Sequence, residues 1–522
     1  MLSLTGAVPA RRFAAVRTGL EAALRFLDRH AAFLLPLPVA VLAAAVIPWA
    51  RRPLWYDELF TYYVATAPTL EKFFDLLLHA DLNPPLGYLP VMVSHALFGH
   101  APLATRLPSA AAFLLAGFIL FVLVRRRLGG LFALGATALL WTGFFLYYAM
   151  EARPYALLLL LSCLSLLCWQ RAMKDGARPA AYWALGACVA ALLLTHCFSP
   201  LLLAPLLAAE AVRSYSARKL DRRMWAALLV PLPLVLTYVP LFLGERAAIV
   251  YPTFFRGSWT TFAGFYRVLI WDRGPLLLLG ILALALMRRP PGSPSARSLF
   301  APHETAFALA ALAAPGALIL YSIGARMSFF YRYGIGACLG VALLATFFVA
   351  HKTNRNLWAA GLFAALALAN SWRQSVDWAS LTGAPESQVS TAYREVHPDW
   401  PFVAANGITF LAMDHAEPPE MVARLYYLTD REASIRYTGG NSFEWFPALC
   451  KQFPVRAHLA AYREFVARHD RFLVLGKPDA PYNWLLRKLQ DDGAELRLII
   501  KLHTDYQEGH LYEVRIPRAG AP

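Results

Sequence analysis

Long runs of apolar residues alternate with short polar segments over residues 1–372 of the chain. The runs are roughly 17–22 residues long, enough to cross a hydrocarbon core of about 30 Å. Each is expected to be helical, because lipid offers no hydrogen-bonding partner to a bare backbone amide. The pattern predicts about 11 spans, near residues 31–50, 106–124, 130–148, 155–170, 181–196, 198–212, 224–243, 275–287, 305–325, 333–350 and 356–371.

Residues 51–104 are interpreted as the first external loop. The span that follows this loop has to end on the inside, because Arg125 to Arg127 come after it and basic clusters favour the cytoplasmic side of a membrane. An additional span at 86–99 would place these arginines outside. The loop is therefore predicted to contain one or two interfacial helices, of which Leu86–Phe98 is the second, with aromatic side chains as anchors at the membrane surface.

From about residue 373 the composition turns polar, and shorter segments of two kinds alternate. Strand-like runs lie at Pro401–Ala405, Arg471–Leu475, Leu496–Leu502 and His510–Ile516, and helical runs at Val455–His469 and Tyr482–Gln490. This alternation predicts a small α/β domain over residues 373–522. We interpret the domain as a lid or an acceptor-docking surface, because it has no glycine-rich phosphate loop and no Ser-His-Asp pattern.

The predicted fold class is mainly α. Residues 1–372 are expected to form a polytopic transmembrane helix bundle with interfacial helices in its first external loop. The α/β domain follows on the extracytoplasmic side, because an odd number of crossings separates it from a cytoplasmic N-terminus. Residues 1–30 are basic and precede the first span, so we expect an uncleaved anchor.

Composition and charge agree with a membrane location. The chain is 58% hydrophobic and 16% charged, whereas soluble domains average about 45–50% and about 25%. The net charge of +16 sits in short clusters at alternate helix ends, the positive-inside pattern of an inner (cytoplasmic) membrane protein. Nucleic acid is excluded as a partner, because binding it requires a continuous basic surface.

The first candidate for chemistry is the acid pair Asp57-Glu58, which lies just beyond the first span. Neighbouring helical residues point about 100° apart, so one acid can face a cavity while the other binds structure. Asp57 suits general-base catalysis, in which a carboxylate removes the proton of an attacking hydroxyl. A solvated acid pair at the membrane surface is the alternative for Asp57 and Glu58.

A second candidate is the segment Glu151-Ala152-Arg153-Pro154-Tyr155, between two predicted spans. Pro154 suits the first turn of a helix, so Arg153 would lie at a helix N-terminus. A guanidinium, free backbone N–H groups and the positive end of the helix dipole would meet there, which favours phosphate. An ordinary interfacial arginine is the alternative.

Further polar residues are predicted at the same outer level. Arg326 and Arg332 lie between aromatic residues in an outer turn that includes Tyr333, against the positive-inside trend, which favours an anionic partner. His196 follows a predicted span and is either structural or a phosphate or metal ligand. Two more outer residues complete the set, namely Asn83, before two prolines, and Arg106, at the entry to the second span. A donor with an apolar tail and an anionic phosphate matches this layout.

Taken together, the motifs resemble the GT-C superfamily of membrane glycosyltransferases, which includes protein O-mannosyltransferases, lipid A aminoarabinose transferases and related bacterial enzymes. The residues that carry the resemblance are Asp57-Glu58, Asn83-Pro84-Pro85-Leu86, Arg106-Leu107-Pro108-Ser109, Glu151-Ala152-Arg153-Pro154-Tyr155, Thr195-His196 and Arg332-Tyr333. Asn83 departs from the usual His of this family, and Gly87 replaces a frequent Tyr.

The resemblance implies a hexosyl- or pentosyltransferase. Its donor would be a polyprenyl-phosphate-linked sugar, and its acceptor a hydroxyl of a glycan, lipid or protein. It also implies inversion at the anomeric carbon, with Asp57 as base and arginines on the leaving lipid phosphate. No cofactor is certain, although some relatives use a divalent metal. The alternatives are a membrane transporter or lipid flippase, a non-catalytic scaffold, and a polymerase or ligase with a lipid diphosphate donor.

Overall fold

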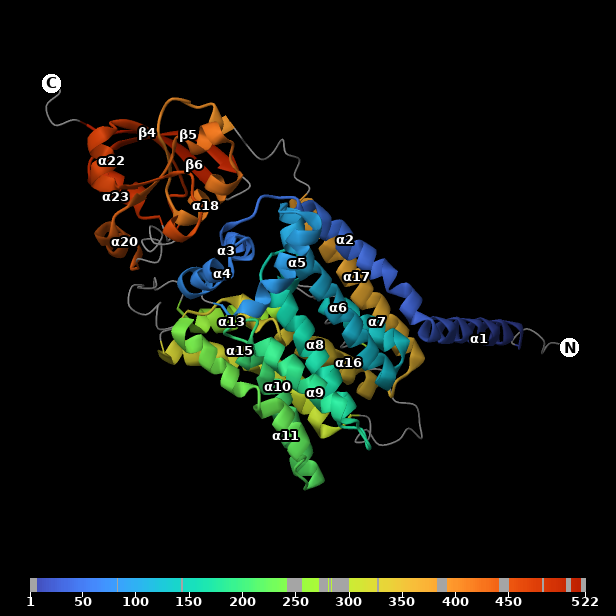
Figure 1. Cartoon of the computed structure of the whole chain (residues 1–522). Coiled ribbons are helices and arrows are strands. Elements are labelled where there is room, and N and C mark those ends of the chain that lie inside the picture. The colour runs from blue at the N-terminus through green and yellow to red at the C-terminus, as the bar shows by residue number, and fades with distance from the viewer. Residues whose placement is uncertain are drawn as a thin grey trace.

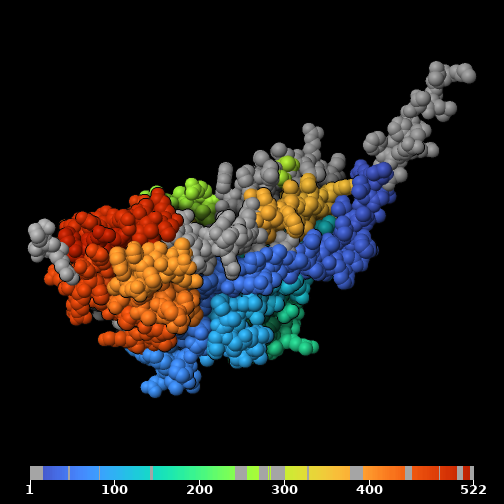
Figure 2. Space-filling view, turned by 90° about the horizontal axis from the view of Figure 1, so that it is seen from above, coloured from blue at the N-terminus to red at the C-terminus, as the bar shows by residue number. Residues whose placement is uncertain are grey.

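A computed structural model describes residues 7–81, 83–141, 144–241, 256–271, 280, 283, 300–325, 328–382, 392–440, 450–480, 483–503 and 508–517. It contains a helical bundle and a C-terminal α/β domain (Figure 1). Figure 2 shows the C-terminal domain, in orange and red, against the blue first loop at one end of the molecule.

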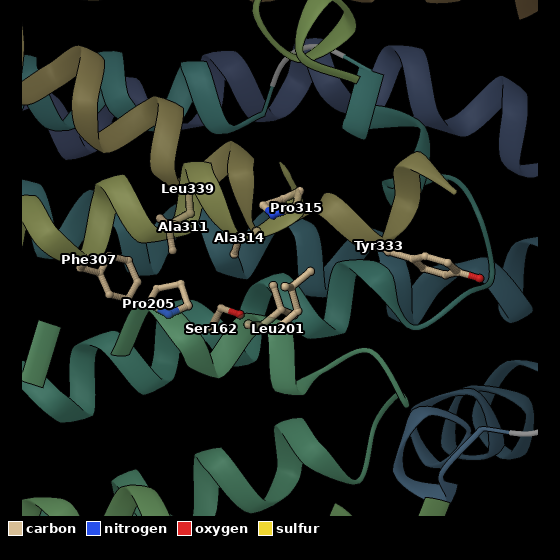
Figure 3. Close-up of a pocket in the computed structure, with 11 residues that line it drawn as sticks. Ser162, Leu201, Pro205, Phe307, Ala311, Ala314, Pro315, Tyr333 and Leu339 are labelled. Carbon is tan, nitrogen blue, oxygen red and sulfur yellow. The ribbon is translucent and has the colours of Figure 1, made fainter. Parts of the chain in front are cut away.

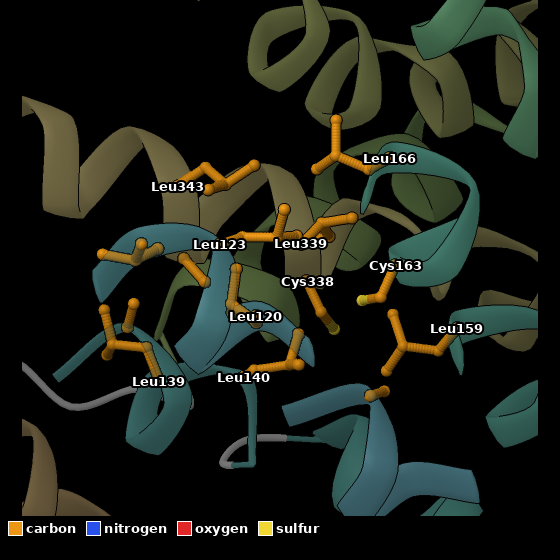
Figure 4. Close-up of a cluster of buried hydrophobic side chains, with 14 of the residues drawn as sticks. Leu120, Leu123, Leu139, Leu140, Leu159, Cys163, Leu166, Cys338, Leu339 and Leu343 are labelled. Atoms are coloured by element: carbon orange, nitrogen blue, oxygen red, sulfur yellow. The ribbon is translucent and has the colours of Figure 1, made fainter. Parts of the chain in front are cut away.

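The bundle is built from helices that are mostly apolar and vary in length. They are α1 (Ala7–Arg29), α2 (Pro36–Ala50), α6 (Pro102–Leu128), α7 (Gly130–Leu140), α8 (Tyr155–Ala172), α9 (Pro179–Leu193), α10 (Pro200–Ala217), α11 (Arg222–Leu229), α13 (Trp259–Trp271), α15 (Pro302–Ala325), α16 (Ala337–Lys352) and α17 (Leu357–Thr382). Leu and Cys side chains of α6, α7, α8 and α16 lie close together at its centre (Figure 4). Apolar residues on every side of these helices suit burial among neighbours or in lipid.

Four helical segments are long and apolar enough to cross a membrane, namely Pro102–Leu128, Tyr155–Ala172, Arg222–Leu241 and Pro302–Ala325. A fifth is formed if the pair Val16–Arg29 and Ala31–Ala44, bent by 79°, counts as one span. The chain is therefore a multi-pass membrane protein. The total of about 11 remains a prediction, because other predicted spans contain shorter helices and 275–287 lies almost wholly outside the described residues.

Two predicted spans differ from the structure at their ends. The predicted span 130–148 contains α7, which ends at Leu140, and a separate 3₁₀ turn, η4 (Phe144–Ala149). The last predicted span, 356–371, corresponds to α17, which continues to Thr382. The helix α1 was not predicted at all, because its many arginines make it polar on one face rather than continuously apolar.

Over its described residues, the first loop folds into five short helical elements, where one or two interfacial helices were predicted. They are α3 (Tyr56–Ala65), α4 (Leu70–Leu76), η2 (Leu77–Asp81), η3 (Pro85–Gly87) and α5 (Leu89–Phe98). The Glu58 carboxylate accepts the Trp55 backbone N–H at 3.2 Å, and Thr69 Oγ1 accepts that of Lys72 at 3.1 Å. These side chains satisfy N–H groups that the start of a helix leaves without partners.

The C-terminal domain contains a six-stranded mixed sheet in the order β3-β2-β1-β4-β6-β5. The strands are β1 (Phe402–Ala404), β2 (Leu425–Thr429), β3 (His458–Ala461), β4 (Arg471–Gly476), β5 (Glu495–His503) and β6 (Glu508–Arg515). Strands β3, β2, β1 and β4 run parallel, whereas β6 is antiparallel to both β4 and β5. The helices are α18 (Gly407–Ala416), α19 (Pro419–Val422), α20 (Arg431–Thr438), α22 (Tyr462–Arg468) and α23 (Leu485–Asp491).

The α/β prediction is confirmed, with two errors of detail. The predicted strands correspond to β1, β4, β5 and β6, but β2 was missed. The predicted helix Val455–His469 is wrong in its first part, where His458–Ala461 is the edge strand β3. Parallel pairing with β2 determines this conformation, and such pairing between distant segments outweighs local propensity.

The C-terminal domain packs on the first loop through a shared apolar core. Phe60 and Tyr63 of α3 contact Phe453, with ring centroids 5.2 and 4.6 Å apart. Lys72 Nζ also donates a hydrogen bond to Gln452 Oε1 at 2.7 Å. The domain therefore supports the helix α3, which carries the candidate acids.

Candidate active site

The predicted site residues gather at one end of the bundle, beneath the first loop. Asp57 is the second residue of α3, and Arg332 lies in the 3₁₀ turn η8 (Tyr331–Gly334) before α16. The Asp57 carboxylate and the Arg332 guanidinium form an ion pair in which each side chain keeps 18% of its surface exposed. This pair joins residues 275 positions apart in the sequence and leaves both charges accessible to a ligand.

Glu58, the next residue of α3, points away from Asp57 into the protein and is fully buried. Arg106 Nε donates to Glu58 Oε1 at 2.7 Å, and Arg106 Nη2 donates to Oε2 at 2.5 Å. The Ala152 backbone N–H donates to Oε1 at 2.8 Å. Arg106 also donates to the carbonyls of Ala50, Arg52 and Pro53. These contacts fix α3 against α6 and the turn 150–154, so they favour a structural role for Glu58 over the predicted catalytic one.

Arg153 directly precedes α8 and pairs with an acid that sequence reasoning missed. Its Nη1 donates to Asp81 Oδ2 at 2.9 Å and to Oδ1 at 3.1 Å. The same nitrogen donates to the Asp57 carbonyl at 3.1 Å and to Thr61 Oγ1 at 3.3 Å. Asp81 lies two residues before Asn83, and this spacing in the loop was the available signal.

Asn83, a predicted site residue, lies beside Asp81 and forms a hydrogen bond with it. Asn83 Nδ2 donates to the Asp81 carbonyl at 3.0 Å, and the Tyr88 hydroxyl donates to Asp81 Oδ2 at 2.5 Å. A Cβ atom at Gly87 would lie 3.1 Å from the Thr195 carbonyl oxygen and 3.2 Å from Pro154 Cβ. This close approach explains why glycine occupies the position, because a larger residue would separate the loop from α8.

Glu151 is the unusual acid of the site. It is 1% exposed, and neither carboxylate oxygen has a hydrogen-bond partner among the described residues. Burial raises the pKa of Glu151 to about 8, an effect that the charge of Arg332 opposes and those of Asp57 and Glu58 reinforce. A carboxyl group with this pKa is neutral at pH 7 and can donate a hydrogen bond.

Aromatic side chains form one wall of the site. Tyr333 stacks on Phe198 with ring centroids 4.0 Å apart, and His196 lies 5.3 Å from Tyr155. His196 Nδ1 accepts the Phe198 backbone N–H at 3.0 Å, and burial holds the pKa of His196 well below its usual range. A neutral histidine with this hydrogen bond does not supply positive charge for a phosphate.

Two further predictions concern Arg326 and a divalent metal. Arg326 lies outside the described residues. Within the part of the chain that the structure describes, no three His, Cys, Asp or Glu side chains gather as a ligand set for a divalent metal. The site is therefore described by its carboxylates, guanidinium groups and rings.

A narrow apolar cavity begins at the aromatic wall. Tyr333 contributes to its lining, and Figure 3 shows the other side chains following along α8, α10, α15 and α16. They include Ser162, Leu201, Pro205, Phe307, Ala311 and Leu339. The polar site thus adjoins a small apolar cavity of about 10 Å³.

Comparisons with known proteins concern the family and the fold of the chain. Residues 82–242, just under a third of the chain, match the model of the dolichyl-phosphate-mannose-protein mannosyltransferase family. This segment contains Asn83, Arg106, Glu151, Arg153 and His196, whereas Asp57 and Arg332 lie outside it. No curated protein sequence matches the chain.

The fold is similar to that of ArnT from Cupriavidus metallidurans. The apo crystal structure matches with a TM-score of 0.53 and 13% identity, over 93% of this chain and 98% of the other. The structure of ArnT bound to undecaprenyl phosphate matches with a TM-score of 0.53 and 15% identity, over 94% and 99%. The resemblance to GT-C glycosyltransferases is confirmed. The chain has the fold of an ArnT-like membrane protein with a C-terminal α/β domain.

Proposed function

We propose that this chain is an integral membrane glycosyltransferase that uses a polyprenyl-phosphate-linked sugar. It transfers the sugar with inversion to a hydroxyl group of a glycan, lipid or protein on the extracytoplasmic face. The observation that carries this proposal is the accessible Asp57–Arg332 ion pair beside buried Arg153 and the apolar cavity. The family match and the ArnT-like fold support the donor class.

Asp57 acts as the general base in this proposal. Its carboxylate takes the proton of the acceptor hydroxyl while the oxygen attacks the anomeric carbon from the face opposite the phosphate. The bond between the anomeric carbon and the phosphate oxygen breaks at the same time, which inverts the configuration. Arg332 is ion-paired with Asp57, so the donor phosphate has to compete for this guanidinium and thereby frees the Asp57 carboxylate to act as the base.

The leaving lipid phosphate is stabilised by fixed positive charge. Arg332 and Arg153 are anchored by rings and by acids, so little reorganisation is required as negative charge develops on the phosphate oxygen. Tyr155 and Tyr333 line the approach, and neutral Glu151 lies ready to donate a hydrogen bond to the same head group. Arg326 is the further candidate in the turn before Arg332.

Positioning roles are assigned to Glu58, Arg106 and Asn83. The first two hold α3 so that Asp57 faces the cavity, and Asn83 orients Asp81 beneath Arg153. His196 packs between Tyr155 and Tyr333 and keeps the aromatic wall in place.

The proposed orientation of the chain in the membrane follows from the distribution of its basic clusters. About 11 spans lie in the inner membrane, with the N-terminus cytoplasmic and the C-terminal domain over residues 373–522 extracytoplasmic. Because this domain packs on α3, it is suited to receive the acceptor next to Asp57.

Turnover by purified protein in lipid tests the proposal. The protein is supplied with a polyprenyl-phosphate sugar and candidate acceptors, and free polyprenyl phosphate and product are measured. An enzyme releases polyprenyl phosphate and yields a product of inverted anomeric configuration. Movement of intact donor between leaflets without its cleavage would instead identify a flippase and overturn the proposal.

A further inference from the structure

A basic cavity lies at the end of the bundle opposite the candidate site. Arg126 and Arg127 end α6, Arg171 and Lys174 follow at the end of α8, and Arg213 projects from α10. With the first residues of α15 they enclose about 540 Å³. Arg106 and Arg126 are 20 positions apart on α6, which places the two sites roughly 30 Å from each other along the helix axis.

The cations of this cavity exceed the acids that face them. Arg127 pairs with Glu304 at 2.7 Å, and Arg213 is held by fully buried Glu210 through bonds of 2.8 and 2.7 Å. Arg126, Arg171 and Lys174 form no ion pair with another described side chain. Three positive charges thus converge on one cavity without compensation, which favours an anionic ligand.

An apolar cavity joins the basic one. It shares the lining residues Arg127, Gln170 and Glu304 and continues between α6, α8, α15 and α16. Its further walls are apolar, among them Leu123, Leu166, Phe307, Leu343 and Phe347. This apolar cavity measures about 30 Å³, so a ligand that reaches both cavities has an anionic head group with a small apolar portion beside it.

We propose that this double cavity binds an anionic phospholipid of the surrounding bilayer, with the phosphate on Arg126, Arg171 and Lys174 and the adjoining apolar part of the lipid at the small cavity between α6 and α8. The positive-inside rule alone explains why basic residues lie at this end, but not why they converge on a cavity with an apolar extension. Basic pockets between transmembrane helices commonly bind such head groups. The proposal is independent of the proposed glycosyl transfer.

The test measures lipid binding to the full chain in a neutral detergent. Phosphatidylglycerol is titrated and detected by native mass spectrometry and by the shift in thermal unfolding, with phosphatidylcholine and inorganic phosphate as parallel probes. Phosphatidylglycerol is expected to bind and to raise the unfolding temperature. Each basic residue near an anionic lipid contributes about fivefold in affinity, so the double variant R171Q/K174Q should bind about 30-fold more weakly.

The matched control is R222Q/R223Q, which removes two exposed cations at the start of α11 that do not line the cavity. Its lipid affinity should stay within about twofold of the unmodified protein. If R171Q/K174Q fails to fold, R126Q provides the same comparison with about a fivefold loss. Equal binding of phosphatidylcholine, an equal shift with inorganic phosphate alone, or equal losses in the control variant would each overturn the proposal.

Discussion

The two ends of the helical bundle differ in how many of their arginines are paired with acids, since of the described arginines that line the basic cavity only Arg127 and Arg213 are paired. At the candidate site, Arg106, Arg153 and Arg332 each pair with an acid and are largely enclosed by protein. At the other end, Arg126 and Arg171 are exposed and have no acidic partner among the described side chains. Burial of a charge is costly unless it is paired, so the first group had to be built together with its acids. The second group remains in contact with water. Its charges either set the orientation of the chain in the membrane or bind lipid head groups.

The largest effect is expected from Asp57→Asn. This change removes the proposed base without altering the size of the side chain, so transfer should fall by about 10²–10⁴. Asp75→Asn in α4 is the matched control, because it neutralises an exposed acid of the same loop. Turnover of the donor measures both. Full activity of the Asp57 variant would refute the base assignment.

Glu58→Gln is expected to affect stability most. It leaves Arg106 buried without its counter-charge, and removal of one partner from a buried pair costs about 3–5 kcal/mol. Thermal unfolding in detergent compares this variant with Glu417→Gln, which removes a buried acid in the C-terminal domain. If Glu58 were instead catalytic, its variant would retain normal stability and lose only turnover.

Arg332→Gln should lower the rate by about 10²–10³, the usual loss for one preorganised donor to a developing anion. Arg332→Lys keeps the charge but not the planar fork, so we expect a partial recovery. Single-turnover kinetics separate this effect from binding. A rate equal to that of the unmodified protein would exclude Arg332 from the leaving-group site.

At the candidate site, the sequence predicted the helices better than it predicted which charged side chains pair with each other. The apolar runs predicted the helix ends that carry Arg106, Arg153 and His196, because lipid imposes length and helicity. Which acid meets which arginine depends on how distant helices pack, as the contact between Asp57 and Arg332 shows. Asp81 was missed for this reason, since a lone loop acid carries no periodic signal.

In the C-terminal domain too, local elements were predicted better than pairing between distant segments. The alternating runs of β1, β4, β5 and β6 were visible locally, whereas β3 adopts its conformation only through pairing with β2. Its exposed edge position gives it no apolar pattern of its own. The prediction of an α/β domain was therefore correct, and that of the helix Val455–His469 was wrong in its first part.

Glu151 provides a pH-dependent contrast with the exposed charges of the other end. Its pKa is raised in the folded state from 4.5 to about 8, so its contribution to stability is full below pH about 4.5 and is lost as pH rises towards 8. Glu151→Gln should remove this loss, which amounts to at most about 1.4 kcal/mol per pH unit. Unfolding measured from pH 5 to 8 should therefore show a gap that favours the variant and widens with pH. A constant gap would contradict the raised pKa.

The smallest effect on transfer is expected at the opposite end. Arg222→Gln removes an exposed cation at the start of α11, outside both the candidate site and the basic cavity, so turnover should change by less than about twofold and stability by about 0.5 kcal/mol or less. The donor-turnover assay measures this variant beside Arg332→Gln. A loss as large as that of the Arg332 variant would show that the two ends are coupled.

Binding of polyprenyl phosphate by the Asp57→Asn and Arg332→Gln variants tests most directly whether acid and guanidinium converge on one head group. Asp57 and the phosphate compete for Arg332, so the Asp57 variant should bind polyprenyl phosphate at least as tightly as the unmodified protein. The Arg332 variant should bind it about tenfold or more weakly. Unchanged affinity in the Arg332 variant, or a loss in the Asp57 variant as large as the loss expected for Arg332→Gln, would contradict the account.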